Sequence, residues 1–294
     1  MSTPDPTTRE GLEAVLAVTR SAAREAAQLA SLGFRRAPAV ELKGEVDLVT
    51  RFDRESEDLL RQRLAEALPF AIVGEERGGA PNDAAFYVDP IDGTTNFVHG
   101  HPFWCVSVGL VVAGQPALGV VISPPLGIEW FGWVAASGER LALRRSVESV
   151  IAQDEHAPRR IVEEPCRVST VAAFESALLA TGFPYDRRTS ADNNFDAFVA
   201  IKKRCQAVRR CGSAALDLCL VSDGTYDGYW ERKLKPWDIA AGIAILRAAG
   251  GRVSDFDGGD RYIETGHVIA TNGAIHEVLA TELARVPSAT GTQT

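Results

Sequence analysis

The N-terminal part of the chain carries apolar residues with the period of an α-helix. Apolar side chains recur every three or four positions before Gly33, at Leu12, Val15, Leu16, Ala22, Ala23, Ala26, Leu29 and Ala30. This spacing predicts an amphipathic helix that glycine terminates. A second helix is predicted over residues 53–68, because leucines recur every four positions up to Leu68 and Pro69 follows.

The pattern then changes to short apolar runs. Residues 70–73 and 86–88 are apolar and are each followed closely by acidic residues, which suits buried strands. Residues 106–112 and 117–122 flank the sequence Ala-Gly-Gln-Pro, which predicts a β-hairpin. We therefore expect strands through the middle of the chain.

The C-terminal third alternates between the two periods. It predicts a helix over 213–221, a strand over 226–230 and a helix over 238–249 that Gly250 and Gly251 terminate. A strand is expected at 252–254. Helices and strands in this order indicate a layered α/β or α+β architecture.

Residues 139–164 differ from their surroundings. Eleven of these 26 residues are charged and none is glycine. We interpret the segment as solvated surface, with one short helix and a loose loop, because charge-rich stretches are usually solvated. A partner-binding insert is the alternative.

Composition narrows the class of protein. The 294-residue chain has a net charge of −8, which argues against a sequence-independent nucleic-acid binder. It has no apolar stretch long enough for a membrane span and no signal-peptide pattern. Its five cysteines are an odd number without a CxxC pair, which favours reduced thiols in the cytoplasm.

Three acidic clusters mark the candidate chemistry. They are Gly74-Glu75-Glu76, the run from Asp89 to Thr95, and Pro236-Trp237-Asp238. Each lies at the predicted end of a strand or start of a helix, where carboxylates are costly unless a positive charge pairs with them. Few lysines or arginines are adjacent, so Mg²⁺ is the expected partner, and two such ions about 4 Å apart can assist a phosphoryl displacement.

The spacing within the second cluster is informative. Pro90 is expected to end the strand, so that Asp92 follows a turn and converges with Asp89. The acids are three positions apart, which excludes the Asp-x-Asp-x-Thr pattern of haloacid-dehalogenase-type phosphatases. Gly93-Thr-Thr-Asn96 can begin a helix whose N–H groups receive a phosphate. A simple β-turn at Asp92-Gly93 is the alternative.

These motifs together resemble those of the inositol monophosphatase family. The resemblance runs from about Leu12 to Leu283 and also includes Val46-Asp-Leu-Val-Thr50 with Asp53, Arg210-Cys-Gly-Ser-Ala-Ala-Leu-Asp217, and Trp237-Asp-Ile-Ala-Ala-Gly242. It implies an α+β, layered α-β-α-β-α sandwich, dependence on two or three Mg²⁺ ions, lithium sensitivity and a homodimer. We expect a single domain of two lobes, residues 7–165 and 166–285, with a disordered tail at 286–294.

The resemblance also implies roles for individual residues. It places the metal ions on Glu75, Asp89, Asp92, Asp238 and the backbone carbonyl of Ile91. Asp53 and Thr94, with Glu75, would activate the attacking water, and Gly93 and Thr94 would hold the phosphate. The polyol would contact Gly212, Ser213, Ala214 and Glu231. The alternatives are a helix N-cap for Asp53 and a solvated strand-end charge for Glu231.

The expected function is a phosphomonoesterase acting on a small phosphorylated polyol. Inositol monophosphate is favoured because the Glu231 carboxylate can accept hydrogen bonds from vicinal hydroxyls. Related phosphatases of histidinol phosphate, NADP, fructose 1,6-bisphosphate or a 3′-phosphonucleotide remain open, and so does a catalytically silent scaffold on the same fold. The sequence departs from the family in residues 139–164, where the usual Gly-rich hairpin with an Asn-Gly turn is missing.

Overall fold

The computed structural model describes residues 3–36, 40–42, 48–148 and 160–286. Its helices are α1 (Arg9–Ser31), α2 (Arg51–Ala67), α3 (Thr94–Val98), α4 (Phe195–Lys202), α5 (Ala214–Ser222), α6 (Pro236–Ala248), α7 (Tyr262–Thr265) and α8 (His276–Arg285), with a short 3₁₀ helix at Phe174–Ser176. Its strands are β1 (Val40–Leu42), β2 (Leu48–Thr50), β3 (Ala71–Gly74), β4 (Ala84–Asp92), β5 (Cys105–Val112), β6 (Gln115–Ser123), β7 (Ile128–Val134), β8 (Arg140–Glu148), β9 (Arg160–Pro165), β10 (Leu178–Thr181), β11 (Ala207–Arg209), β12 (Gly228–Glu231), β13 (Arg252–Ser254) and β14 (Val268–Thr271).

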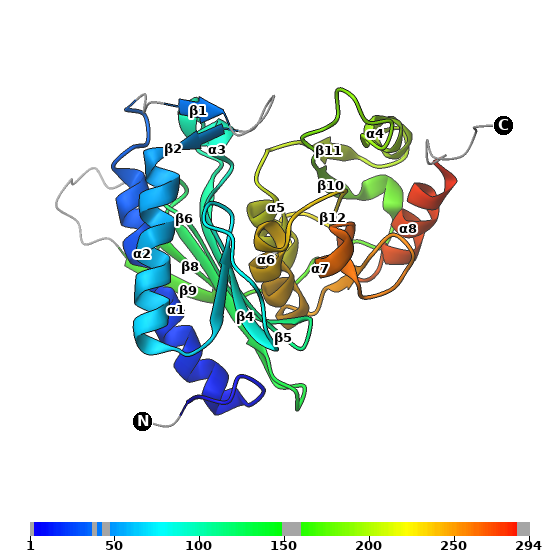
Figure 1. Cartoon of the computed structure of the whole chain (residues 1–294). Helices are drawn as coiled ribbons and strands as arrows, with labels where there is room; N and C mark the ends of the chain where they lie inside the picture. Colours follow the sequence, from blue (N-terminus) through cyan, green and yellow to red (C-terminus); the bar gives the residue numbers. More distant parts are fainter. Residues whose placement is uncertain (1–2, 37–39, 43–47, 149–159, 287–294) are drawn as a thin grey trace.

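These elements stack in five layers (Figure 1). Helices α1 and α2 cover one face of a seven-stranded sheet with the order β3-β4-β5-β6-β7-β8-β9. Helices α5 and α6 separate this sheet from a five-stranded sheet with the order β11-β10-β12-β14-β13, and α4 and α8 lie beyond it. The predicted α-β-α-β-α sandwich is confirmed.

The first two predicted helices are present and form the outer layer. The buried side of α1 contains Leu12, Val15 and Leu16, which pack with the α2 leucines Leu60 and Leu64 against the sheet. Helix α2 begins two residues earlier than predicted, because Thr50 is its N-cap. The apolar stripes therefore predicted the packing surfaces correctly, while the capping residue was missed.

Strand β4 continues beyond the point where we expected it to end. Pro90 lies inside the strand, and the pairing with β5 shifts register between Asp89 and Asp92. A bulge of this kind accommodates a proline that cannot donate to the ladder, and β4 regains its partner at Cys105. The prediction that Pro90 ends the strand was wrong, and both acids lie within the buried part of β4.

The short helix and loose loop predicted within residues 139–164 are absent from the described part, although Arg140, Glu163 and Glu164 are exposed, as expected for solvated surface. Residues 140–148 and 160–165 are the antiparallel strands β8 and β9 at the edge of the large sheet, and residues 149–159 lie outside the described residues. Leu141 and Leu143 pack against the main core, while Arg144 lies directly opposite Glu164. The charges are thus cross-strand partners on an edge, where charged residues also discourage pairing with other chains.

The middle layer is buried from both sides. Helix α6 packs closely on β5 and β6 at Gly109 and Gly119, which have no side chains to hold it away. A Cβ at Gly119 would lie 2.1 Å from the carbonyl oxygen of Ala241. This close approach places the first turn of α6, with Asp238, beside the end of β4. The predicted C-terminal elements are present as α5, β12, α6 and β13, with the β12 strand starting two residues later than expected.

The large sheet ends at Pro165, which coincides with the expected lobe boundary. One apolar cluster nevertheless includes Val73 and Tyr87 from the large sheet together with Tyr229 and Val268 from the small one. The division into two lobes stays a prediction. The predicted tail lies outside the described residues, apart from Val286. No helix in the described part of the chain is long and apolar enough to cross a membrane.

Candidate active site

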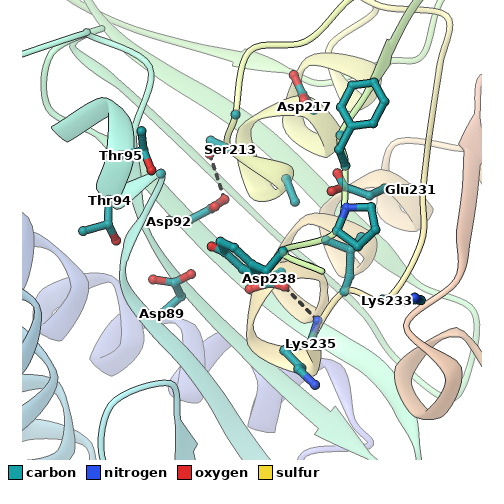
Figure 2. A pocket seen from close by; sticks show the side chains of 18 of the residues that line it. Asp89, Asp92, Thr94, Thr95, Ser213, Asp217, Glu231, Lys233, Lys235 and Asp238 are labelled. Atoms are coloured by element: carbon teal, nitrogen blue, oxygen red, sulfur yellow. Dashed lines mark hydrogen bonds between the residues drawn. The ribbon is translucent and has the colours of Figure 1, made fainter. Parts of the chain in front are cut away.

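A cavity of about 490 Å³ lies where β4, α3, β10, α5, β12 and α6 meet. The residues predicted for the site that line it are Glu75, Asp89, Ile91, Asp92, Gly93, Thr94, Gly212, Ser213, Ala214, Glu231 and Asp238. Figure 2 shows Asp89, Asp92 and Asp238 around one part of the cavity, and Glu231 in another part. The fold therefore brings these residues together, while their individual roles stay predictions.

Glu75 is presented by a tight turn after β3. The turn is held from below by Glu57 of α2, whose buried carboxylate accepts the backbone N–H groups of Glu76 at 2.6 Å and Arg77 at 3.0 Å. Arg61, one turn further along α2, donates to the same carboxylate at 2.8 Å. Sequence analysis missed Glu57, because nothing in the local sequence shows that α2 lies beneath this turn.

Asp89 and Asp92 are anchored in different ways. Asp89 accepts the backbone N–H of Ile91 at 2.9 Å, which stabilises the bulge in β4. Asp92 accepts the Ser213 hydroxyl and the backbone N–H of Ala215, both at 2.7 Å. Asp92 is therefore seated on the N-terminus of α5, where the free N–H groups and the helix dipole favour an anion.

Asp238 also lies at the N-terminus of a helix, in this case within α6 itself. It is the third residue of the helix, and its Oδ2 accepts the backbone N–H of Lys235 at 2.7 Å. Pro236 begins the helix, which suits its missing N–H group. The motif Pro236-Trp237-Asp238 is thus a helix start that directs one carboxylate into the cavity.

Burial changes the acidity of these groups. It raises the pKa of Asp92 to about 6, against the lowering effect of its hydrogen bonds from Ser213 and Ala215. Burial, followed by repulsion from neighbouring acids, raises the pKa of Asp89 well above its usual value. The pKa of Asp238 rises for the same reasons. Ionised together, these carboxylates repel one another in a poorly solvated site.

The donor set suits a hard cation. Among the described residues, no ion pair joins Asp89, Asp92 or Asp238 to a lysine or arginine, so the charge of these acids is not already neutralised. The described ranges also contain no group of three or more histidine, cysteine, aspartate and glutamate side chains assembled tightly enough to hold an ion alone. Mg²⁺ fits this arrangement, because it binds through one or two carboxylates and keeps several waters or takes substrate oxygens.

Asp53 lies behind the cavity wall and reaches it through Thr94. Its Oδ1 accepts the Thr94 hydroxyl at 3.1 Å, and its Oδ2 accepts the backbone N–H and hydroxyl of Thr50 at 2.8 and 2.6 Å. The N-cap is therefore Thr50, and Asp53 completes a capping box as the third residue of α2. The N-cap interpretation of Asp53 was wrong, although Asp53 does help to cap α2.

Gly93 begins α3, as predicted. Its φ of 99° is in the left-handed region, and a Cβ there would lie 3.0 Å from the carbonyl oxygen of Phe103. Asn96 ties this turn to the loop before α5 by donating to the carbonyl oxygens of Phe103 at 2.7 Å and Cys211 at 2.8 Å. The phosphate-binding role of the turn stays a prediction.

Glu231 ends β12 with its side chain packed against protein. Its carboxylate accepts the Tyr229 hydroxyl, and a Cβ on Gly182 would lie 2.0 Å from Glu231 Oε2. Burial raises the pKa of Glu231 to about 7, while Tyr229 and the Arg210 guanidinium lower it. These contacts do not fit the alternative of a solvated strand-end charge.

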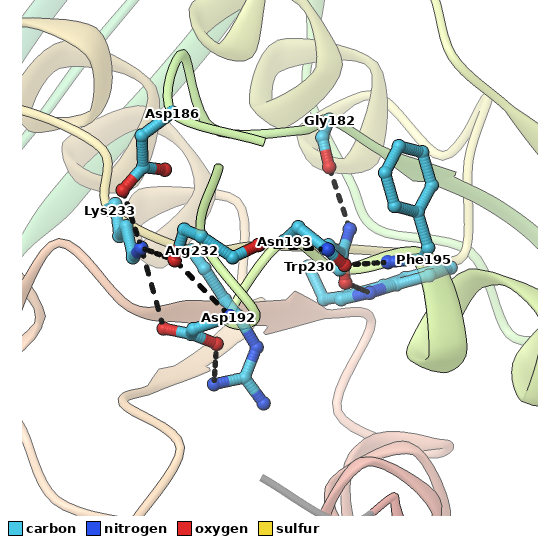
Figure 3. Close-up of polar contacts among 10 residues, drawn as sticks. Gly182, Asp186, Asp192, Asn193, Phe195, Trp230, Arg232 and Lys233 are labelled. Carbon is cyan, nitrogen blue, oxygen red and sulfur yellow. Dashed lines mark hydrogen bonds and ion pairs between the residues drawn. The ribbon is translucent and has the colours of Figure 1, made fainter. Parts of the chain in front are cut away.

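Sequence analysis missed one wall of the cavity. Residues 182–195 leave β10 and supply the lining residues Gly182, Phe183, Pro184, Tyr185, Arg187 and Phe195. Figure 3 shows how Lys233 and Arg232, which follow β12, hold this segment. Lys233 donates to Asp186 at 2.8 Å, and Arg232 pairs with Asp192 at 3.2 Å.

A buried polar contact fixes the same wall from inside. The Asn194 amide donates to the Gly182 carbonyl oxygen at 2.6 Å, and the Trp230 indole N–H donates to the Asn194 oxygen at 2.9 Å. The only local signal for this wall is the run Gly182-Phe-Pro-Tyr185, which marks a turn but not the cavity that the turn faces.

Comparisons with known proteins agree on one family. The model of the inositol monophosphatase family matches residues 11–288. An inositol-1-monophosphatase of Synechocystis is 41% identical over 84% of this chain and 81% of its own length. A Nus factor SuhB of Pseudomonas aeruginosa is 34% identical over 92% of this chain and 96% of its own length. The solved structure of an inositol monophosphatase from Anabaena superposes with a TM-score of 0.77 at 33% identity, covering 96% of this chain and 99% of that one.

The role of Glu57 can be tested by measuring how much its substitution destabilises the protein. We expect Glu57→Gln to lower the free energy of unfolding by about 1–3 kcal/mol, because an amide brings N–H donors to a position that receives three donors. Urea denaturation measures the change. Glu66→Gln, an exposed change on the same helix, is the control and should stay within about 0.5 kcal/mol. Equal, small effects of the two changes would show that Glu57 does not hold the turn.

Proposed function

Because the chain belongs to the inositol monophosphatase family, we propose that it is a Mg²⁺-dependent phosphomonoesterase that hydrolyses inositol monophosphate to inositol and phosphate. Family membership itself indicates a phosphoric monoester hydrolase. The observation that carries the proposal is one cavity in which Asp89, Asp92 and Asp238 converge without an ion pair to any described lysine or arginine, while Glu231 lines another part.

The acids would hold the metal ions. We assign this role to Glu75, Asp89, Asp92, Asp238 and the carbonyl oxygen of Ile91, with two or three ions. Bound Mg²⁺ supplies positive charge for the phosphate oxygens and lowers the pKa of a water. The rise in the pKa values of Asp89 and Asp238 supports this assignment, because repulsion from neighbouring acids contributes to it and a cation at this place would relieve that repulsion.

Thr94 and Asp53 would handle the proton of the attacking water. The Thr94 hydroxyl donates towards Asp53 Oδ1 and the Ile91 carbonyl oxygen, so its own oxygen can accept a hydrogen bond from a water in the cavity. Asp53 is fully buried and can take a proton relayed through this hydroxyl. Glu75 would orient the same water. The turn at Gly93 and Thr94 would hold the phosphate.

The polyol would occupy the cavity near Gly212, Ser213, Ala214 and Glu231. The Ser213 hydroxyl already donates to Asp92, so its contribution to the substrate is that of an acceptor or of its backbone. Glu231 is fixed by Gly182 and Tyr229, which leaves its carboxylate preorganised for substrate hydroxyls. Preorganised acceptors of this kind favour a hydroxyl-rich substrate.

The substrate has to be tested separately from the reaction class, because the relatives carry different names. Those named inositol-1-monophosphatase and those named Nus factor SuhB both match most of this chain. Histidinol phosphate, NADP, fructose 1,6-bisphosphate and 3′-phosphonucleotides are the alternatives within the class. Lithium sensitivity, a homodimer and a cytoplasmic location remain parts of the proposal. A silent scaffold is disfavoured by the convergence of costly buried acids.

We expect phosphate release from inositol 1-phosphate to require added Mg²⁺. Among the residues that the structure describes, no lysine or arginine forms an ion pair with the three aspartates, so without a cation their negative charge would repel the phosphate. Release should stop when a chelator is added and return with excess Mg²⁺. Turnover at an undiminished rate in metal-free buffer would exclude the metal-dependent mechanism.

We expect Asp92→Asn and Asp238→Asn each to reduce kcat by orders of magnitude while the protein still folds. An amide keeps the shape of the side chain and loses the charge that attracts the cation. Steady-state kinetics and metal content report the two effects. Asp196→Asn, an exposed change on α4, is the matched control. Near-normal kcat and metal content in both site variants would show that the assignment of the metal ligands is wrong.

We expect Glu231→Gln to lower kcat/KM for inositol 1-phosphate relative to 4-nitrophenyl phosphate. Loss of one charge-assisted hydrogen bond costs about 1.5–3 kcal/mol, which corresponds to about ten- to a hundredfold in this ratio. The aryl phosphate has no vicinal hydroxyls to lose. The surface change Glu264→Gln serves as control. An unchanged ratio would remove the support for inositol while leaving the phosphatase assignment intact.

A further inference from the structure

A second carboxyl group lines the cavity near Glu231, and the proposed chemistry does not use it. Asp217 lies in the first turn of α5, is 2% exposed and lines the cavity. Figure 2 shows Asp217 and Glu231 at the same end of the cavity, away from Asp89 and Thr94. The repulsion between Asp217 and Glu231 is the largest effect of any neighbouring charge on Asp217.

The protein does not satisfy the hydrogen bonding of Asp217. Its Oδ1 is buried and has no hydrogen-bond partner, and no side-chain hydrogen bond or ion pair of this carboxyl occurs among the described residues. A buried polar group without a partner costs roughly 1–3 kcal/mol.

Arg210 is the basic group that faces this pair. Its guanidinium lowers the pKa values of both Asp217 and Glu231, and it lies against Gly212, where a Cβ would be 2.6 Å from an Arg210 nitrogen. One guanidinium thus balances two carboxyl groups. Burial raises the pKa of Asp217 well above its usual value, which favours a neutral acid that can donate as well as accept.

We propose that Asp217 is a specificity-determining residue that hydrogen-bonds a substrate hydroxyl remote from the phosphate, the hydroxyl being shared with Glu231. This inference rests on the proposed function and deepens it by naming the chemistry of the substrate's far end. A hydroxyl can donate to the Glu231 carboxylate and accept from the Asp217 acid at the same time. An ammonium group cannot accept, and a carbonyl group cannot donate, so neither satisfies both residues.

The test combines changes in the protein with changes in the substrate. The kcat/KM values of wild type, Asp217→Leu, Asp217→Ala and Asp217→Asn are measured with Mg²⁺ on inositol 1-phosphate, its singly deoxygenated analogues and 4-nitrophenyl phosphate. The matched control is Asp223→Asn, at the other end of α5, where the acid accepts the Trp130 indole N–H at 3.0 Å and lies outside the cavity. Thermal unfolding identifies variants that do not fold.

We expect wild type to discriminate against one deoxy analogue by about ten- to a hundredfold. In Asp217→Leu and Asp217→Ala that discrimination should fall about tenfold, together with the ratio of kcat/KM for inositol 1-phosphate to that for the aryl phosphate. Asp217→Asn keeps a donor and an acceptor and should stay within about threefold of wild type. Should Leu not fold, the Ala variant carries the same comparison.

The proposal is overturned if the variants at Asp217 change the substrate ratio no more than Asp223→Asn does. It is also overturned if every deoxy analogue keeps its wild-type penalty in Asp217→Ala, because the carboxyl would then read no hydroxyl. Failure of the proposed function is seen separately, as the absence of Mg²⁺-dependent hydrolysis of both inositol 1-phosphate and 4-nitrophenyl phosphate by wild type.

Discussion

The electrostatic cost of holding several carboxyl groups in one poorly solvated cavity governs the architecture of this protein. Asp89, Asp92 and Asp238 are all buried, and burial raises their pKa values, with repulsion from neighbouring acids adding to the rise for Asp89 and Asp238. In an unfolded chain, these carboxyl groups would be solvated and far apart. They stay together because each belongs to an element fixed by the core, such as α6, which packs closely over Gly109 and Gly119 of the large sheet.

Helix N-termini reduce that cost. Asp53 is the third residue of α2, Asp238 is the third residue of α6, and Asp92 accepts the first free N–H groups of α5. In each case the partial positive charge of the helix end lies beside the acid. The arrangement combines two functions, because the same hydrogen bonds that cap a helix also fix the direction of a site carboxylate. The acids therefore accept hydrogen bonds at helix starts, while no ion pair within the described part of the chain balances the charge of Asp89, Asp92 or Asp238.

The sequence predicted the structure best where neighbouring residues in the chain determine it. Gly93 at the start of α3 follows from turn rules, and the leucine stripes of α1 and α2 follow from helical period, whereas α6 begins at Pro236, two residues before its predicted start. Prediction failed where partners are distant. The charges of β8 are paired with those of β9 across a sheet, and Glu57 supports the turn of Glu75 from another helix. In both interactions the partners lie far apart in the sequence, so no local sequence pattern reveals them.

The cavity joins two regions of different chemistry, and this division explains why sequence assigns the reaction class more firmly than the substrate. The acids Asp89, Asp92 and Asp238 occupy a helix start and a strand bulge, which leave recognisable motifs. The other end is built by Glu231, Asp217 and the wall at Gly182, residues from β12, α5 and the segment after β10 that meet only in the fold. Under the proposed function, changes there would alter which hydroxyls are bound without moving Asp89, Asp92 or Asp238. A chain can therefore keep the hydrolytic motifs while its substrate preference is set by contacts that no motif records.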